Sequence, residues 1–362
     1  MNADDQRWLD AAARQAAPFL GTTAENPTVG AIVVDAASQR LLGRAVTARG
    51  GRPHAESQAI DDAGSAAKGA TLYVTLEPCN HWGRTPPCVD AILRAGIARV
   101  VVGIRDPDPR TDGQGMQRLR DAGVEVVLAD HAPSARLHEG FVMRLTRGRP
   151  FVTAKLAVSA DGKVGLPNQA NVPITGEAAR RWTHMQRALA DAVIIGAGTA
   201  RVDDPQLTVR RAGLEARTPL RVVVAGGRTL NTRMNLIASL SGYPVAIIAT
   251  PENPVKAPPS VEVIRVSGVR GRPDPKLALA ALGAKGLSNV LVEAGSTFLA
   301  ALLDAGLVDR FHLLVGEGEV GPLGLPATPK GSIEGRIGAA GFSLVDHRVL
   351  GADNLRTFER VF

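Results

Sequence analysis

The stretch TLYVTLEPCNHWGRTPPCVDAILRA, residues 71–95, predicts a strand, a loop with two cysteines and a helix in immediate succession. Residues 71–76 are mostly apolar or β-branched, which is typical of a short buried strand. Residues 88–95 carry apolar side chains at helical spacing, and Pro86 and Pro87 stiffen the chain just before them. A strand that leads through a loop into a helix is typical of an α/β layer.

The same alternation continues on both sides of this stretch. We expect strands at 29–35, 41–48, 99–104 and 124–128, and helices at 5–19, after His54, at 115–122 and at 134–146. Further along, we expect strands at 151–157, 192–196, 220–225, 245–250, 289–292, 311–316 and 355–362, and helices at 177–190, 275–283 and 297–305. Both halves of the chain are therefore predicted to be α/β.

The best candidate for a domain boundary is Arg147-Gly148-Arg149-Pro150, because its glycine and proline interrupt both periodicities. The chain has 362 residues, and single cores stop growing at about 250–300 residues. We therefore predict two domains, residues 1–147 and 148–362.

Three residues form a candidate zinc site, and they include both cysteines of the chain: His54, Cys79 and Cys88. A structural zinc is closed by four protein ligands, whereas a catalytic zinc keeps its fourth position for water. Cys88 opens a helix, and a helix N-terminus favours thiolate over thiol. The alternative is a pair of ordinary buried cysteines with a histidine nearby by chance.

Glu56 lies two residues after His54, at the start of a predicted helix, where its carboxylate can face the same site. A zinc-bound water has a pKa of about 7, and a neighbouring carboxylate can move its proton to a leaving amine. The pattern H-x-E followed by P-C-x-x-C is the signature of zinc deaminases. Here eight residues separate Cys79 from Cys88 instead of two, so Cys88 must return to the metal after a loop.

Composition limits the other classes of function. The formal net charge is +7, but Lys and Arg are scattered and aromatic residues make up only 4%, whereas nucleic-acid binders usually have a basic stripe or stacking aromatics. A dispersed positive charge suits a small phosphorylated ligand or simply aids solubility. We expect no nucleic-acid partner, no membrane partner and a cytoplasmic protein, because no signal peptide or membrane span is visible and no disulfide framework remains.

Several ordered motifs resemble the bifunctional riboflavin-biosynthesis deaminase/reductase family, whose cysteine spacing is also eight residues. The motifs cover both domains. They are Asn26-Pro27-Thr28-Val29-Gly30, Pro53-His54-Ala55-Glu56, the run 75–88, Asp106-Pro107-Asp108-Pro109, the run 155–162, the run 198–210 and Val292-Glu293-Ala294-Gly295.

This resemblance implies a cytidine-deaminase-like α/β/α domain followed by a dihydrofolate-reductase-like α/β domain. It implies a multifunctional enzyme, both a zinc hydrolase and an NADPH-dependent oxidoreductase. The first domain would deaminate 2,5-diamino-6-ribosylamino-4(3H)-pyrimidinone 5′-phosphate, and the second would reduce the ribosyl chain of the product to ribityl. It also suggests a homodimer through the C-terminal domain.

The resemblance further assigns residues to roles. Asn26 would hold the pyrimidine edge, and His81 would either contact the ribose phosphate or be an ordinary loop residue, with a fourth metal ligand as a less favoured possibility. The cofactor residues would be Ala157, Thr199, Asp203, Gly295, Ser296 and Thr297. The substrate residues of the second domain would be Lys155, Arg187, Leu207, Arg210 and Glu293, where the two arginines suit phosphate. Each also has a structural interpretation: Arg187 as a solvated helix residue, Asp203 as a cap and Leu207 as core.

The chain departs from the family pattern at three places. Asn171-Val172-Pro173 replaces a Ser-x-Trp, Ala225-Gly226 replaces Asp-Ser, and Thr47 replaces a histidine. The first two changes affect the expected cofactor site of the second domain.

Two other classes of function remain as alternatives. A nucleic-acid-editing zinc deaminase with a non-catalytic basic C-terminal module would need a clustered basic face. A non-catalytic zinc-stabilised binding protein would need a fourth ligand and would have no use for Glu56.

Overall fold

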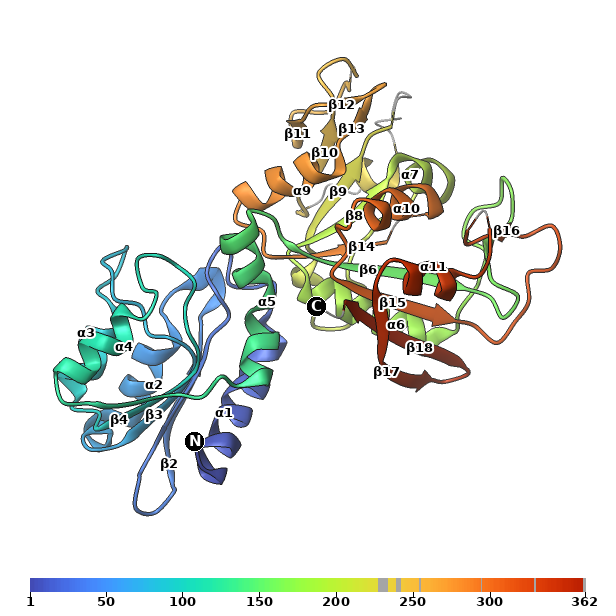
Figure 1. The fold of residues 1–362 in the computed structure, drawn as a ribbon. Helices are drawn as coiled ribbons and strands as arrows, with labels where there is room; N and C mark the ends of the chain where they lie inside the picture. The colour runs from blue at the N-terminus through green and yellow to red at the C-terminus, as the bar shows by residue number, and fades with distance from the viewer. Residues whose placement is uncertain (227–233, 239–241, 254, 294, 329, 361–362) are drawn as a thin grey trace. The chain divides into compact units, whose positions relative to one another are not determined.

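The computed structural model describes residues 1–226, 234–238, 242–253, 255–293, 295–328 and 330–360. The chain divides into two compact units, Met1–Gly148 and Arg149–Phe362 (Figure 1). Each unit has its own sheet and its own hydrophobic clusters. No helix among the described residues has the length and apolar character that a bilayer crossing needs.

The first unit is built on a five-stranded sheet with strand order β2-β1-β3-β4-β5. Its strands are β1 (Gly30–Val34), β2 (Leu41–Val46), β3 (Thr71–Leu76), β4 (Arg99–Ile104) and β5 (Glu125–Leu128). β1 runs antiparallel to β2 and β3, whereas β3, β4 and β5 are parallel. All six residues of β3 are buried, as its apolar run predicts for a central strand.

Helices cover both faces of this sheet. They are α1 (Ala3–Ala16), α2 (Ala55–Ala63), α3 (Cys88–Ala95), α4 (Gln114–Asp121) and α5 (Ala132–Arg147). Successive residues of a strand point to opposite faces. Accordingly Val100 and Val102 of β4 pack in the cluster that contains α2, α3 and α4, whereas Val101 packs in the cluster that contains α1. The carboxyl end of β3 and the starts of α2 and α3 therefore carry the candidate metal ligands.

The second unit contains a nine-stranded sheet with strand order β11-β10-β9-β8-β14-β6-β15-β18-β17. The strands are β6 (Phe151–Val158), β8 (Ala192–Gly196), β9 (Leu220–Val224), β10 (Val245–Ala249), β11 (Val261–Arg265), β14 (Asn289–Val292), β15 (Arg310–Val315), β17 (Phe342–Leu350) and β18 (Asp353–Arg360). The strands from β11 to β15 are parallel, and β18 and β17 close one end antiparallel.

The helices of the second unit flank this sheet. They are α6 (Glu177–Leu189), α7 (Ala197–Asp203), α8 (Asn235–Ala238), α9 (Pro275–Ala284), α10 (Ser296–Asp304) and α11 (Ile333–Ala339). Two small ribbons, β7 (Lys163–Gly165) with β16 (Leu325–Pro326) and β12 (Gly268–Val269) with β13 (Arg272–Pro273), complete it. The α/β class predicted for both halves is confirmed.

Some elements differ from the sequence prediction. The glycine-rich turn expected at 196–199 is the first turn of α7, because Gly196 is its N-cap and the chain continues helically through Arg201. β11, β17 and α11 were not expected at all. The last two residues of the strand predicted at 355–362 lie outside the described residues.

Candidate functional site

His54, Cys79 and Cys88 lie together in the first unit, and all three are held by the ends of regular elements. His54 is the N-cap of α2, Cys79 follows β3 and Cys88 is the first residue of α3. His54 Nδ1 lies 3.3 Å from the Cys88 sulfur and 3.6 Å from the Cys79 sulfur, and the three ligand atoms are all within 4.8 Å of one another. Tetrahedral zinc with its usual bond lengths requires N···S separations of about 3.5 Å. The residues therefore fit zinc as they stand.

Glu56 completes this site with a buried carboxylate, which is hydrogen-bonded to Cys88 but has one oxygen unpaired among the described residues. It is 3% exposed, and its Oε2 has no hydrogen-bond partner among the described residues. Burial raises the pKa of Glu56, and the nearby Cys79 adds to this effect. A buried carboxyl group whose pKa is raised is suited to proton transfer, because it holds a proton more readily than an exposed carboxylate does.

The electrostatics of the two cysteines differ from each other. Hydrogen bonding to Cys88 lowers the pKa of Cys79 to about 4, whereas hydrogen bonding to Cys79 and burial raise the pKa of Cys88. Zinc takes cysteine as thiolate, so the expectation that the N-terminus of α3 favours the Cys88 thiolate stays a prediction. The Cys88 backbone N–H also donates to the Cys79 sulfur at 3.3 Å, which adds to the lowering of the Cys79 pKa.

Glu77 fixes the loop that carries Cys79, and sequence reasoning missed it. Its Oε2 accepts from the backbone N–H of Asp106 at 3.3 Å and of Gly113 at 3.0 Å, and its Oε1 accepts from Met116 N–H at 3.1 Å. Burial raises the pKa of the neighbouring Asp106 to about 7. A buried glutamate at the end of an apolar strand was the only signal in the sequence.

The remaining residues predicted around the metal lie on the surrounding loops. Asn26 packs against Gly51, where a Cβ would lie 2.2 Å from the Asn26 amide nitrogen and φ is +88°, so only glycine fits. His81 is outside the metal cluster, and its Nδ1 lies 3.4 Å from the Thr111 hydroxyl. Thr47 binds its own neighbours, accepting from Val29 N–H at 2.9 Å.

Lys155, Arg187 and Glu293 lie together in the second unit. Arg187 on α6 makes two hydrogen bonds to the Glu293 carboxylate, at 2.5 and 3.0 Å, and Lys155 Nζ of β6 lies 3.7 Å from Glu293 Oε2. Burial opposes the charge on Glu293, but Arg187 and Lys155 outweigh it and hold the pKa of Glu293 at about 2. Arg187 is therefore an ion-paired, partly buried residue and not a solvated one.

The residues predicted to bind the cofactor lie around two helix starts. Gly295 is the N-cap of α10, and its N–H donates to the Thr199 hydroxyl of α7 at 3.0 Å. Ser296 is half-buried and Thr297 is exposed on the first turn of α10. Hydroxyl groups and free N–H groups at a helix start suit a phosphate, so this donor set fits a dinucleotide such as NADPH.

The two other predicted cofactor residues, Asp203 and Ala157, do not lie at a helix start. Asp203 ends α7, where burial raises its pKa, and its backbone carbonyl accepts from the Asn171 side chain at 3.5 Å. Ala157 lies on β6, two residues after Lys155 of the Glu293 cluster. Pro173 is exposed where the family pattern has an aromatic residue.

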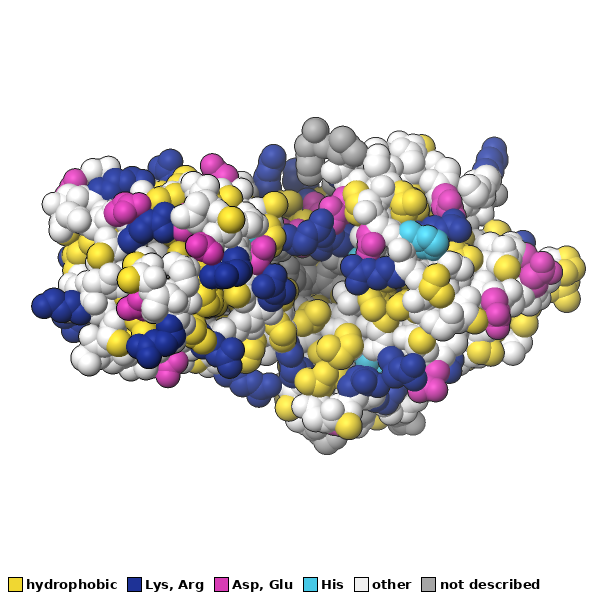
Figure 2. Space-filling view, turned by 90° about the horizontal axis from the view of Figure 1, so that it is seen from below, with side chains coloured by type: hydrophobic (Ala, Val, Ile, Leu, Met, Phe, Trp, Pro, Cys, Tyr) yellow, Lys and Arg dark blue, Asp and Glu magenta, His cyan; other side chains and the backbone are white. Residues whose placement is uncertain are grey.

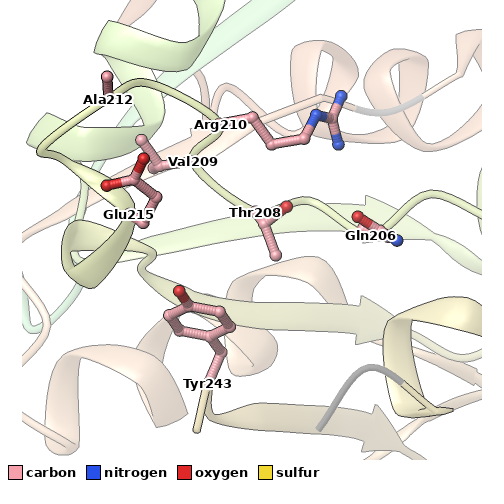
Figure 3. Close-up of a pocket in the computed structure, with 7 residues that line it drawn as sticks. All are labelled: Gln206, Thr208, Val209, Arg210, Ala212, Glu215 and Tyr243. Atoms are coloured by element: carbon pink, nitrogen blue, oxygen red, sulfur yellow. The ribbon is translucent and has the colours of Figure 1, made fainter. Parts of the chain in front are cut away.

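A pocket of about 570 Å³ lies beside Arg210 in the second unit. Figure 3 shows Gln206, Thr208 and Arg210 on one segment and the Tyr243 ring across from it, with the Arg210 side chain extending away from that ring. Arg210 is the only predicted substrate residue that lines this pocket. Leu207, in contrast, is 2% exposed and packs in the hydrophobic core, as its structural interpretation states.

Comparison with protein families gives two matches. The model of the cytidine and deoxycytidylate deaminase zinc-binding region matches residues 2–104, and the model of the RibD C-terminal domain matches residues 150–354. The zinc ligands and Glu56 lie in the first match, and the Lys155–Arg187–Glu293 cluster lies in the second.

Whole proteins give the same result. The riboflavin biosynthesis protein RibD of Escherichia coli is 35% identical over 86% of this chain and 87% of that protein, and the one of Aquifex aeolicus is 37% identical over 89% and 91%. A solved structure of Acinetobacter baumannii RibD has a TM-score of 0.83 at 31% identity, covering 99% of both chains. The diaminohydroxyphosphoribosylaminopyrimidine deaminase/5-amino-6-(5-phosphoribosylamino)uracil reductase of Thermotoga maritima has a TM-score of 0.84 at 29% identity, also covering 99% of both.

Proposed function

Because this chain belongs to the RibD family of riboflavin-biosynthesis proteins, we propose that its two reactions are divided between residues 1–147 and 148–362. The chain is a bifunctional enzyme that uses zinc and NADPH. The first domain replaces the ring amine of 2,5-diamino-6-ribosylamino-4(3H)-pyrimidinone 5′-phosphate by oxygen from water and releases ammonia. The second reduces the ribosyl chain of that product to ribityl.

His54, Cys79 and Cys88 would hold the zinc ion, which when bound makes water a nucleophile at neutral pH. Glu56 would take the proton of that water and return it to the departing amine. Its unpartnered Oε2, its burial and its raised pKa support this assignment. Asn26, held against Gly51 three residues before His54, would bind the pyrimidine edge.

In the second domain, NADPH would supply the hydride. Its contacts would be with Thr199, Asp203, Gly295, Ser296, Thr297 and Ala157. The residues that would bind the substrate are Lys155, Arg187, Leu207, Arg210 and Glu293. Arg187 is already paired with Glu293, so it would mainly hold that carboxylate in place. Leu207 would contribute through its backbone, because its side chain is in the core.

The observation that carries the deaminase assignment is the buried Glu56 carboxylate beside three zinc-type ligands, with its Oε2 unpaired among the described residues. We expect Glu56→Gln to keep zinc, because the ligands are untouched, and to lose ammonia release by at least about 100-fold, the usual contribution of a proton-transfer group. Zinc is measured by elemental analysis and ammonia by its release from the diaminopyrimidine ribotide. NADPH oxidation with the deaminated ribotide is the internal control and should be unchanged.

The outcomes separate the two halves of the proposal. Ammonia release retained by Glu56→Gln would contradict the proton-transfer role. Ammonia release without NADPH oxidation in the unmodified enzyme would contradict the reductase assignment.

The editing alternative is not favoured. Figure 2 shows Lys and Arg side chains interspersed with acidic and hydrophobic ones on both units, and no basic stripe is visible on that face. The non-catalytic binding-protein alternative does not explain Glu56, because burying a carboxylate costs free energy and that role makes no use of it.

Two further features belong to this proposal. A homodimer through the C-terminal domain is supported by the edge strand β17, on which Leu344, Val345 and Val349 are exposed. Measuring the mass of the protein in solution tests this. A cytoplasmic location is supported by the use of both cysteines as metal ligands, which requires reducing surroundings.

A further inference from the structure

The segment Gln206–Arg210 joins α7 to the rest of the second unit and lies in no strand. Side chains satisfy its backbone instead. Two arginines bind its carbonyl groups: Arg221 Nη1 donates to Gln206 O at 3.0 Å, and Arg187 Nη1 donates to Thr208 O at 3.1 Å. This segment, which we call the 206–210 segment, therefore has a fixed backbone although it has no strand partner among the described residues.

The amide groups of the same segment are also bound by side chains. Val209 N–H donates to the Thr218 hydroxyl at 3.0 Å, and Arg210 N–H donates to His184 Nδ1 at 3.2 Å. His184 and Arg187 are three residues apart on α6, so they lie on one face of that helix. One helix face thus holds a carbonyl and an amide of the tripeptide that ends at Arg210.

These contacts hold a strained conformation. Leu207 has φ of +55°, which is unusual for a large side chain and is energetically unfavourable. Such a backbone persists only when its surroundings determine it. Each side-chain contact to the segment therefore helps to keep Arg210 in its observed position.

Arg210 is the cation of this region that is available for a ligand. Arg187 uses its guanidinium on Glu293 and on Thr208 O. In the part of the chain that the structure describes, no side chain pairs with the Arg210 guanidinium. Burial and the nearby Arg187 lower the pKa of Arg210, and the more distant Glu293 carboxylate only partly offsets them.

His184 can accept the Arg210 N–H only through an unprotonated Nδ1. Its surroundings favour this form, because burial and the charges of Arg187 and Arg210 lower the pKa of His184 to about 4, although Glu293 and a hydrogen bond to the Thr208 backbone oppose them. His184 is therefore a neutral acceptor at neutral pH. A protonated ring would point its own N–H at the Arg210 amide.

We propose that His184 is a positioning residue of the reductase, which holds the Arg210 backbone so that the Arg210 guanidinium meets the phosphate of the pyrimidine substrate. The proposal rests on the proposed function, because it takes the substrate to be the phosphorylated pyrimidine. It adds a residue outside the set that the family resemblance indicates. His184 itself need not touch the substrate.

The test compares two substitutions of His184. His184→Leu removes the acceptor, whereas His184→Asn keeps an oxygen near the position of Nδ1. We expect His184→Leu to raise the KM for the deaminated ribotide about tenfold, the effect of losing one hydrogen bond of average strength. The kcat and the KM for NADPH should change less than twofold, and His184→Asn should restore most of the loss.

A double-mutant cycle tests whether the effect passes through Arg210. Arg210→Met alone should raise the same KM, and adding His184→Leu to it should raise the KM no further. The substrate without its phosphate provides a second check, because its KM should be insensitive to His184→Leu. Independent, multiplying effects of the two substitutions would overturn the proposal.

Matched controls exclude a general loss of folding. Arg181→Leu changes an exposed position on the same helix and should leave both activities at the unmodified level. Ammonia release by the deaminase unit of His184→Leu should also be unchanged. If the unmodified enzyme oxidises NADPH and His184→Leu leaves the KM for the deaminated ribotide unaltered, only the role of His184 is refuted. If the unmodified enzyme does not oxidise NADPH, the proposed function itself is refuted.

Discussion

Glu293 is a buried carboxylate whose charge is maintained by two cations, and this has a consequence for stability. Its pKa is about 2, below the ordinary value of 4.5, because Arg187 and Lys155 outweigh its burial. A depressed carboxylate pKa stabilises the folded state at pH values above the ordinary value. That stabilisation is lost as the pH falls from about 4.5 towards about 2.

We therefore expect Glu293→Gln to lower the free energy of unfolding of the second unit by about 3 kcal/mol at pH 7, because it leaves two cations without their counter-ion. Urea unfolding at a series of pH values measures this. The difference between the unmodified protein and the variant should shrink below about pH 4.5. A difference that stays constant down to pH 2 would contradict the ion-pair explanation.

At the scale of elements, Glu77 joins the end of β3 to the segment that leads into α4. It is the acceptor for three backbone N–H groups, and it lies two residues before the zinc ligand Cys79. Replacing a residue that holds a metal ligand in position without itself touching the metal usually changes metal affinity by about 10–100-fold.

We expect Glu77→Ala to weaken zinc binding by that factor and Glu77→Gln, which keeps one acceptor oxygen, to weaken it less. Competition with a chromophoric chelator measures the affinity. Glu25→Ala, at an exposed position, is the matched control. Equal zinc affinity in all four proteins would show that the Cys79 loop keeps its shape without Glu77.

The elements that the sequence predicts well are those whose signal is local. β3 and α3 have the predicted bounds. β3 is marked by an apolar run, and α3 by a helical repeat of apolar residues that directly follows two prolines. β17 was missed because its residues are exposed on both faces and show no alternation. α7 was missed because Gly196 at its N-cap and Gly198 in its first turn are also typical of a loop.

The sites follow the same division. His54, Glu56, Cys79 and Cys88 were predicted as a cluster from their residue types and spacing, and the structure brings them together. Glu77 and His184 could not be predicted, because their partners are backbone groups that lie far away in the sequence. Tertiary structure alone decides which backbone amides such side chains meet.

At the scale of the whole molecule, the metal ligands belong to one unit and the Glu293 cluster to the other. The hydrophobic cluster around α2 and α3 contains only residues of the first unit, and the largest cluster of the second unit contains only residues after 150. A ligand that binds only the folded state stabilises the unit that it binds, by RT ln(1 + [L]/Kd).

We therefore expect two thermal transitions, of which only one depends on zinc. Removing zinc with a chelator should lower the midpoint of the first unit by several degrees, since a stabilisation of about 2.7 kcal/mol is lost for a ligand present at 100 times its Kd. Saturating NADPH should raise only the other midpoint. Differential scanning calorimetry measures both, and Cys88→Ser, which disrupts the metal site, should behave like the chelated protein. A single transition that both ligands shift would mean that the two units unfold as one, and that zinc in the deaminase unit also stabilises the reductase.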